Sequence, residues 1–411
     1  MFVRRTAAVL AATTAIGAVL APAALAADSS PSPSTATPSG LYGSADPTYD
    51  GVWRQSLALL AQHTVGVRPA AKAVDWLTGQ QCANGAFAAF RADASAACDA
   101  KTQVDTNSTA AAVQSLAALG GHDDAAGRAV TWLKSAQNKD GGWGYMAGGP
   151  SDTNSTSVVI GALHAVGKKP QSVSKDGKSP YDALLKLSLP CKGKGDGAFA
   201  YQPDKRGGLA ANADATAAGV TAGMGQGFVA QTGNAFALTG CVVADTPDMA
   251  DAAGNGANYL AGAMAKTSYL TSALPGADDQ PDYGNTADAV VALSAIGATK
   301  DTKKPLAWLE KNSAAWAAKS GPAAYAQLIF AAHSAGTDPR DFGGQDLVAK
   351  LNATGPAPST AGASATPSEK KDDEKKDDGG GLGVWWIVGV GLVAGIGIGF
   401  LISARNKNRQ L

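Results

Sequence analysis

The stretch DTNSTAAAVQSLAALG at Asp105–Gly120 decides the fold, and DTNSTSVVIGALHAVG at Asp152–Gly167 repeats it. Each copy opens on an aspartate, which caps a helix N-terminus, and closes on a glycine, which adopts the left-handed conformation that ends a helix. Between these ends, apolar and small residues cover nearly every face, as is typical of a helix that is buried on all sides. Both stretches therefore predict buried helices.

Looser copies of this block recur along the chain, and each predicts a further buried helix. They are DATAAGVTAGMG at Asp214–Gly225, NTADAVVALSAIG at Asn285–Gly297 and GPAAYAQLIFAAHSAG at Gly321–Gly336, with a first segment at Tyr49–Val65. Shorter blocks alternate with them, and these place apolar residues at helical spacing beside polar ones. The shorter blocks are AVDWL at Ala73–Leu77, AVTWL at Ala129–Leu133, DALLKL at Asp182–Leu187, GANYL at Gly256–Leu260 and PLAWL at Pro305–Leu309.

Buried and amphipathic helices that alternate along a chain have a simple packing arrangement. The buried helices form an inner ring, the amphipathic helices form an outer ring, and each pair buries its faces against its neighbours. We therefore expect an all-α fold, an α/α toroid of about six inner and about six outer helices. All inner helices should begin at the same end of the ring.

A loop of repeated sequence leads from an amphipathic helix to the buried helix that follows it. It reads QCANGAF at Gln81–Phe87, QNKDGGW at Gln137–Trp143 and GDGAF at Gly195–Phe199. We expect the glutamine to cap the preceding helix, the glycines to turn the chain, and the aromatic ring to pack over the turn.

These residues carry a resemblance to known families, which covers the chain from about Tyr49 to Leu351. Gln137–Trp143 fits the Q-x₃-G-x-W repeat of squalene and oxidosqualene cyclases, and the paired helices resemble prenyltransferase and squalene cyclase repeats. The DTxxTAxAVxAL pattern is similar to the helical barrel of the cobalamin carriers, intrinsic factor and transcobalamin. The resemblance implies an α/α toroid, but toroids host unrelated tasks. The carriers add a β-domain that covers the corrinoid, and we expect none here, so a membrane partner would have to close the site.

The N-terminal residues 1–26 are expected to be a secretory signal peptide. Arg4 and Arg5 precede a mostly apolar run at Thr6–Leu20, and Ala24-Leu25-Ala26 offers a small-residue cleavage site. A first transmembrane helix is the alternative. Residues 27–45 are rich in Ser, Pro and Thr, which predicts a disordered linker before the toroid ectodomain at 46–353.

The C-terminal part predicts a membrane anchor. Residues 354–382 are expected to form a Pro/Ser-rich and then charged stalk, 383–403 one transmembrane helix, and 404–411 a basic cytoplasmic tail. An uncharged stretch of about 20 residues can cross a bilayer, and basic residues directly after it stay inside. The chain is thus expected to be a single-pass plasma-membrane protein with its ectodomain outside the cell.

Three glycines in the expected membrane helix, Gly391, Gly395 and Gly399, repeat every four residues. This spacing lets another transmembrane helix approach closely, so it is compatible with a homodimer or a transporter partner. The alternative is that a membrane helix simply tolerates glycine.

Charge and cysteine content narrow the class of protein. Formal charge is balanced, with 34 Lys and Arg against 34 Asp and Glu, which argues against a nucleic-acid partner. The cysteines lie in the expected exported part, where disulfides form. We expect the pairs Cys82–Cys98 and Cys191–Cys241, because each closes a local loop; a metal site is the alternative, although the spacing lacks C-x₂-C.

No catalytic residues, metal ligands or cofactor are assigned from the sequence. The D-x-D-D acid of a class II terpene cyclase is missing, and Asp123-Asp124 and Asp278-Asp279 lie in predicted turns. Cys82 is followed by Ala-Asn-Gly, which lacks the Cys-Gly-Glu-Gln of thioester domains. The histidines are scattered, and His164 and His333 are explained by their places near helix C-termini.

The common end of the inner helices is the expected ligand site, with polar groups and aromatic rings gathered there. The expected ligand-binding residues are Asp105, Asp152, Asp214, Phe87, Trp143, Tyr145, Tyr201 and Tyr283. Each also has a structural explanation, since the aspartates cap helices and the aromatic residues pack over turns.

Three functions follow as hypotheses. The first is a membrane-anchored binding protein that supplies a transporter with a large amphipathic ligand, a corrinoid or a polyprenyl-like molecule; it predicts a deep pocket. The second is a surface enzyme of the terpene cyclase-like or glycan-processing type, which needs converging acid–base groups. The third is a structural adhesin, which predicts a toroid plugged by side chains.

Overall fold

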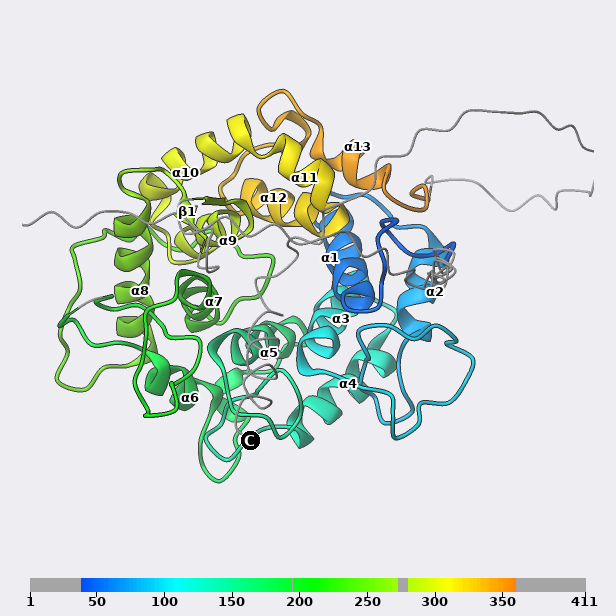
Figure 1. Ribbon diagram of the computed structural model, residues 1–411, viewed down its shortest axis with the longest axis horizontal. Helices are drawn as coiled ribbons and strands as arrows, with labels where there is room; N and C mark the ends of the chain where they lie inside the picture. Colours follow the sequence, from blue (N-terminus) through cyan, green and yellow to red (C-terminus); the bar gives the residue numbers. More distant parts are fainter. Residues whose placement is uncertain (1–37, 194, 273–279, 360–411) are drawn as a thin grey trace, which may run out of the picture. The chain divides into compact units, whose positions relative to one another are not determined.

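Helices alternate between two rings in the computed structural model, which describes residues 38–193, 195–272 and 280–359 (Figure 1). Six helices of the described chain form the inner ring: α1 (Gly51–Thr64), α3 (Thr106–Leu119), α5 (Thr153–Ala165), α7 (Ala213–Gly223), α9 (Tyr283–Ala295) and α12 (Pro322–Ser334). Each packs against the next one along the chain, and α12 packs against α1, which closes the ring. The predicted inner ring is confirmed.

Six outer helices of the described residues surround this ring: α2 (Ala71–Gly79), α4 (Asp123–Ser135), α6 (Pro180–Leu187), α8 (Met249–Met264), α10 (Thr299–Asn312) and α13 (Leu347–Asn352). Each packs on the inner helix that precedes it in the chain. The sequence did not predict α13, nor the short helices α11 (Ala314–Ser320), η1 (Pro170–Ser172) and η2 (Pro339–Asp341). Strands β1 (Leu270–Thr271) and β2 (Pro281–Asp282) form an antiparallel pair before α9.

Small residues allow the inner helices to be buried on all sides. In α3, every residue from Thr106 to Leu116 is buried, and Ala110, Ala111 and Ala112 have no exposed surface. Asp105 and Asp152 cap α3 and α5 as predicted, each accepting a backbone N–H at 2.6 Å.

Two predicted caps are corrected. Asn212 caps α7 and Asp282 caps α9, so Asp214 and Asn285 lie inside the first turns instead. An N-cap residue has an extended backbone and stands directly before the first helical residue. Both helices begin before the apolar pattern does, so their caps lie earlier in the chain than predicted.

A threonine one turn into four inner helices anchors the loop that precedes the helix. Its Oγ1 accepts the backbone N–H of the loop residue that packs over the turn. The pairs are Thr109 with Phe87 (2.9 Å), Thr156 with Trp143 (3.0 Å), Thr216 with Phe199 (2.9 Å) and Thr286 with Leu270 (3.0 Å). The DTxxT pattern thus encodes a cap and a loop anchor together.

The loop glutamines join neighbouring repeats and do not cap the preceding helix, which corrects the prediction. Gln137 Nε2 donates to the carbonyl oxygens of Gly141 (2.8 Å) and Val173 (3.3 Å). Gly141 has a φ of +93°, and a Cβ there would lie 2.1 Å from the carbonyl oxygen of Ser179. Glycine is therefore required for both its conformation and the close approach.

Both predicted disulfides are present. Cys82 pairs with Cys98 and Cys191 with Cys241, so no described cysteine is free.

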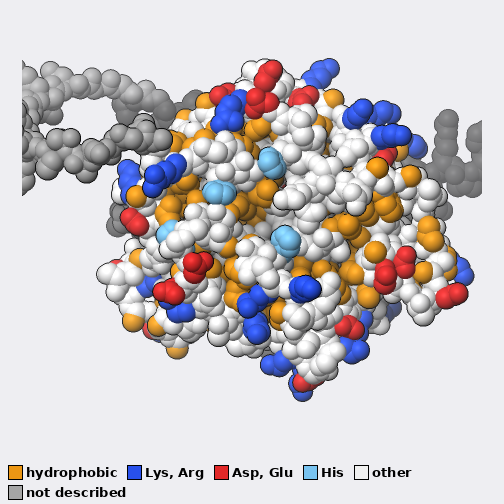
Figure 2. All heavy atoms as spheres, turned by 180° about the vertical axis from the view of Figure 1, so that it is seen from behind, with side chains coloured by type: hydrophobic (Ala, Val, Ile, Leu, Met, Phe, Trp, Pro, Cys, Tyr) orange, Lys and Arg blue, Asp and Glu red, His pale blue; other side chains and the backbone are white. Residues whose placement is uncertain are grey.

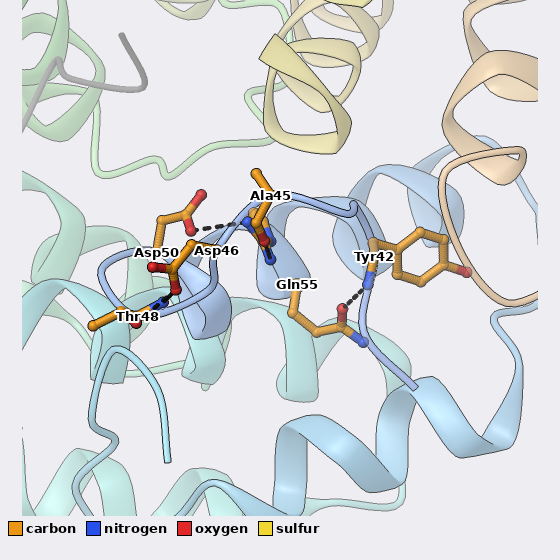
Figure 3. A network of polar contacts seen from close by, with 7 residues as sticks. Tyr42, Ala45, Asp46, Thr48, Asp50 and Gln55 are labelled. Carbon is orange, nitrogen blue, oxygen red and sulfur yellow. Dashed lines mark hydrogen bonds and ion pairs between the residues drawn. The ribbon is translucent and has the colours of Figure 1, made fainter. Parts of the chain in front are cut away.

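The domain begins earlier than the sequence indicated, because residues 38–45 pack on it. Tyr42 has no exposed surface, and its backbone N–H donates to Gln55 Oε1 of α1 at 2.9 Å (Figure 3). The Tyr42 hydroxyl also donates to the carbonyl oxygen of Pro356, at 3.0 Å, so the two ends of the domain meet. A buried tyrosine with satisfied hydrogen bonds explains why this part of the expected linker is ordered.

The other expected segments lie outside the described residues. These are the signal peptide at 1–26, most of the linker, the stalk beyond 359, the transmembrane helix at 383–403 with its three glycines, and the basic tail. No helix within the described ranges has the length and apolar character needed to span a bilayer.

Candidate functional site

The inner helices begin at one end of the ring, where the first turns of α3 and α5 each meet the loop of the next repeat. The N–H of Thr106 in α3 donates to the carbonyl oxygen of Tyr145, at 2.9 Å, and the N–H of Thr153 in α5 donates to that of Tyr201, at 3.0 Å. Tyr145 and Tyr201 belong to the loops that lead to α5 and α7, so these contacts place neighbouring helix starts side by side.

A few inner-helix residues remain partly accessible to solvent on one side of the ring. Asp288 is the one residue of α9 between Thr286 and Ala295 that is not buried. Gln327 in α12, Trp53 in α1 and Asp214 in α7 are likewise half-buried. We call these four residues the lumen group, since they come from the adjoining inner helices α7, α9, α12 and α1.

Amides from neighbouring helices hold the two lumen carboxyl groups. Asn154 Nδ2 of α5 donates to Asp214 Oδ2 of α7 at 2.6 Å. Gln327 Nε2 of α12 donates to Asp288 Oδ2 of α9 at 3.1 Å. An amide on an adjacent helix of the ring thus positions each carboxyl group.

Both carboxyl groups titrate near neutrality. Loss of hydration raises the pKa of Asp288 to about 8, with the carboxyls of Asp214 and Asp282 adding to the effect. Loss of hydration also raises the pKa of Asp214 to about 7, and Asp282 and Asp152 raise it further, while the hydrogen bond from Asn154 lowers it. Their neutral forms are therefore well populated at physiological pH.

Further acidic residues lie at the starts of the inner helices. We call this region the rim; it includes the N-cap residues Asp105 and Asp152 and the loop residues Tyr145 and Tyr201. Burial raises the pKa of the N-cap residues Asp105 and Asp152 to about 6. Burial raises the pKa of the Tyr201 hydroxyl, and the nearby Asp152, Asp214 and Tyr145 raise it further. These mutual effects show that the rim tyrosines and aspartates lie within electrostatic reach of one another.

Buried polar atoms without a partner gather in the first turns of α3 and α5. Asp105 Oδ2 and Asp152 Oδ2 accept no hydrogen bond, and neither does Asn154 Oδ1. Both side-chain amide atoms of Asn107 are unpartnered, although the residue is 2% exposed. Such groups are costly to bury unless something else completes their hydrogen bonds.

No basic side chain neutralises the rim. The ion pairs of the described chain are Arg54–Asp50 and Lys178–Asp182, and neither includes a rim or lumen carboxyl. The described residues also contain no cluster of His, Cys, Asp or Glu that could hold a metal ion.

Five of the predicted ligand-binding residues have limited access to a ligand, and two of them, Asp105 and Asp152, are buried N-cap residues. Phe87 and Trp143 are fully buried, and Trp143 Nε1 donates to the carbonyl oxygen of Leu133 at 2.7 Å. Tyr283 stacks between Trp308 and Trp316, with ring centroids 5.0 and 5.5 Å away, so both of its faces are covered. The half-buried Asp214, Tyr145 and Tyr201 remain closest to the expected site.

Sequence reasoning missed Asp288, Asp282, Gln327 and Trp53. A signal was available for two of them, because Asp288 and Gln327 interrupt helices that are otherwise apolar all round. A charged or amide residue in such a helix must face solvent or a partner. For Trp53 the sequence held no comparable signal, since an aromatic residue is ordinary in a buried helix.

One surface cavity of about 480 Å³ lies away from this group. It is lined by Ala83, Asn84 and residues of the first turns of α4, including Asp123 and Arg128. It contains none of the predicted or observed site residues.

No family model matches the chain, and neither does any curated protein. Among solved structures, a protein from Actinoplanes is similar, with 15% identity and a TM-score of 0.43 over 72% of this chain and 79% of that one. The ent-copalyl diphosphate synthase from Streptomyces platensis is similar, with 16% identity and a TM-score of 0.46 over 70% of this chain and 50% of the synthase. The second match thus spans half of the synthase. Neither likeness bears on the function of this chain, which its own residues must indicate.

Proposed function

We propose that this chain is a binding protein whose rim and lumen group take a large, amphipathic ligand that carries many hydrogen-bond donors. The observation that carries the proposal is the pair of half-buried carboxyl groups, Asp214 and Asp288, each held by an amide of an adjacent helix. A ligand with amide or hydroxyl arms would donate hydrogen bonds to these carboxyl groups.

The charge of the site favours one of the two ligands expected from the sequence, a corrinoid, over the other, a polyprenyl-like molecule. The carboxyl groups raise one another's pKa values and have no basic neighbour in an ion pair. The carboxyl groups of Asp105 and Asp152, with pKa values of about 6, are mainly ionised at neutral pH, so an anionic polyprenyl phosphate would meet like charge at this rim and be repelled. A corrinoid has several uncharged carboxamide arms around an apolar macrocycle, so it fits better.

The proposal includes the cellular setting expected from the sequence. The signal peptide, the membrane helix and the basic tail would hold the binding domain outside the plasma membrane, where a transporter could receive the ligand. A site at the rim of a ring also leaves one side of a large ligand open, which suits a partner that closes over it.

A second candidate function is acid–base catalysis, and one observation favours it. Asp288 and Asp214, with pKa values of about 8 and about 7, lie within electrostatic reach of each other. A carboxylic acid that stays protonated near neutral pH can donate a proton to a substrate.

Binding is tested with the full chain in detergent, by native mass spectrometry and calorimetry with cobalamin and with a polyprenyl phosphate. We expect a stoichiometric complex with cobalamin and none with the phosphate. Asp214→Ala and Asp288→Ala should each weaken cobalamin binding at least tenfold, about 1.4 kcal/mol. The control Asp123→Ala, an exposed residue of α4, should leave it unchanged.

Asp288→Asn separates the two functions. An amide resembles the neutral acid in shape and hydrogen bonding, so the variant should keep cobalamin affinity within about threefold. An amide has no proton to give, so an enzyme would lose turnover with its substrate. If the full chain binds no cobalamin under conditions in which it is folded, the corrinoid proposal fails.

A further inference from the structure

The segment between α7 and α8 enters the ring from the end where the inner helices finish. Residues Gln226–Thr232, which we call the plug, have no regular secondary structure. The side chain of Gln226 staples the plug into a closed loop, because its Oε1 accepts from the Gln231 N–H (2.6 Å) and its Nε2 donates to the Gln231 carbonyl oxygen (3.1 Å). The tip of this loop carries Phe228.

The tip contacts three consecutive inner helices of the ring, α12, α1 and α3. The N–H of Phe228 donates to Gln114 Oε1 of α3, at 3.0 Å. The Phe228 ring meets Trp53 of α1 edge-on, with centroids 5.2 Å apart, and stacks near Phe330 of α12 at 6.4 Å. Because the plug also contacts α5, which lies across the ring from α12, it must lie toward the middle of the ring.

The plug has a close backbone contact with α5. A Cβ on Gly161 would lie 2.7 Å from the Cα of Gly227 and 2.9 Å from Gln114 Nε2. Gln114 is 4% exposed, and its Nε2 donates to the carbonyl oxygen of Val158 at 3.1 Å. The buried amide of Gln114 thus links α3, α5 and the plug. The chains can approach this closely because Gly161 and Gly227 have no side chains.

The far side of the plug is also fixed. Ser334 Oγ of α12 donates to the carbonyl oxygen of Ala230 (3.0 Å), and Thr232 Oγ1 donates to the carbonyl oxygen of Ser334 (2.9 Å). Just beyond the plug, the N–H of Gly233 donates to the Ser294 carbonyl oxygen of α9 at 3.0 Å. Contacts with α1, α3, α5, α9 and α12 therefore hold the plug and the residue that follows it in place. The plug follows the end of α7 in the chain.

Most contacts of the plug lie below the Asp288–Gln327 pair, whereas its tip reaches Trp53, the third residue of α1. Gln114, Gly161 and Phe330 are each the ninth residue of their helix, whereas Asp288 and Gln327 are each the sixth. At 1.5 Å per residue, the contacts at these ninth residues lie roughly 12 Å from the helix starts and about one turn below the Asp288–Gln327 pair. His63, His164 and His333 lie in the last turns of α1, α5 and α12. The face of the molecule seen in Figure 2 carries histidine side chains among mainly uncharged ones.

We propose that Gln226–Thr232 is a built-in plug that closes the C-terminal end of the ring, with the Phe228 ring, packed against Trp53, as the aromatic floor of the site. A ligand then enters and leaves at the end where the inner helices begin, and Phe228 sets how deeply it can insert. The floor role rests on the proposed binding function, whereas the seating of the plug does not.

Hydrogen exchange of the full chain in detergent, without ligand, tests the seating. In the wild type, the amides of Phe228 and Gly233 should exchange slowly. Gly161→Ala should push the plug out and raise the exchange rate over 226–233 at least tenfold, while the peptide from α3 stays protected. The matched control is Gly127→Ala in α4, where an added Cβ meets nothing within 4 Å. Rapid exchange of these amides in the wild type, or no change in Gly161→Ala, would overturn the proposal.

A second variant keeps the test decisive if Gly161→Ala does not fold. Phe228→Ala removes the tip ring and leaves the backbone free to adopt its conformation, so it should also raise exchange over 226–233. With cobalamin bound, the same variant should release the ligand at least fivefold faster than the wild type, and an unchanged rate would remove the floor role. If the wild type binds no cobalamin, the binding function fails while the exchange experiment still decides whether the plug is seated.

Discussion

Asn154 of α5 donates a 2.6 Å hydrogen bond from Nδ2 to Oδ2 of Asp214 in α7. The two residues are far apart in the sequence, and they occupy the same position of the DTNST-like repeat in neighbouring helices. The repeat therefore supplies its own partner from one copy to the next, and α5 must pack against α7 for the carboxyl of Asp214 to be held. A change that disturbs the packing of α5 against α7 would therefore also displace the carboxyl of Asp214.

The threonine anchor predicts a stability loss that depends on one hydroxyl. Thr156→Val keeps the shape of the side chain but leaves the buried N–H of Trp143 without its acceptor, so it should lower the free energy of unfolding by about 1–3 kcal/mol. Urea unfolding followed by circular dichroism measures this. Thr131→Val, at an exposed position of α4, is the control and should stay within about 0.5 kcal/mol of the wild type. Equal effects of the two changes would contradict the anchor.

The loop glycine Gly141 should not tolerate even a methyl group. Gly141→Ala adds left-handed backbone strain and a clash with the Ser179 carbonyl oxygen, so we expect a loss of about 3 kcal/mol. Gly148→Ala has a similar positive φ with nothing near its Cβ, so it should cost about 1 kcal/mol through strain alone. Thermal unfolding of the two variants separates the clash from the strain. A loss no greater than that of Gly148→Ala would show that the repeats are not so closely packed here.

Stability should fall as the pH rises through neutrality. The folded protein raises the pKa of Asp288 to about 8 and that of Asp214 to about 7, whereas an unfolded aspartate titrates near 4. The folded state therefore binds more protons than the unfolded state between about pH 4 and 8, so this contribution is present at low pH and lost as pH rises through the folded pKa values. Urea unfolding at pH 5, 7 and 9 measures the slope.

A variant identifies the source of this pH dependence. Asp288→Asn removes one titrating group and should make the free energy of unfolding less dependent on pH between 5 and 9. Asp123→Asn removes an exposed carboxyl of α4 and should leave the slope as it is in the wild type. The explanation is wrong if both variants keep the same slope.

The two disulfides should differ in their contribution to stability. Cys191–Cys241 closes a loop of 50 residues and Cys82–Cys98 one of 16. On the chain-entropy account, the longer loop restricts the unfolded chain more, by about 1 kcal/mol. The Cys191→Ser/Cys241→Ser variant should therefore unfold at a lower denaturant concentration than Cys82→Ser/Cys98→Ser. The reverse order would show that native packing at the shorter loop outweighs the entropy.

The disulfide pairing and the order of inner and outer helices were predictable from the sequence because both depend on local signals. Asp105 and Asp152 mark helix starts, and apolar residues on every side mark burial. The sequence did not predict α11 and α13, which are short and lack a strong repeat pattern. It placed the caps of α7 and α9 too late, because the apolar pattern starts after the first turn.

By itself, the sequence determined that two kinds of helix alternate and that the all-apolar kind must be enclosed, since no other arrangement removes every face from water. Only the tertiary structure decided which side chains meet across the ring. Asp214, Asp288, Gln327 and Trp53 come from four helices, and the plug tip reaches the middle from a loop without periodicity. Such meetings depend on how helices are rotated and stacked, and a pattern of burial along one helix does not specify its neighbour's rotation.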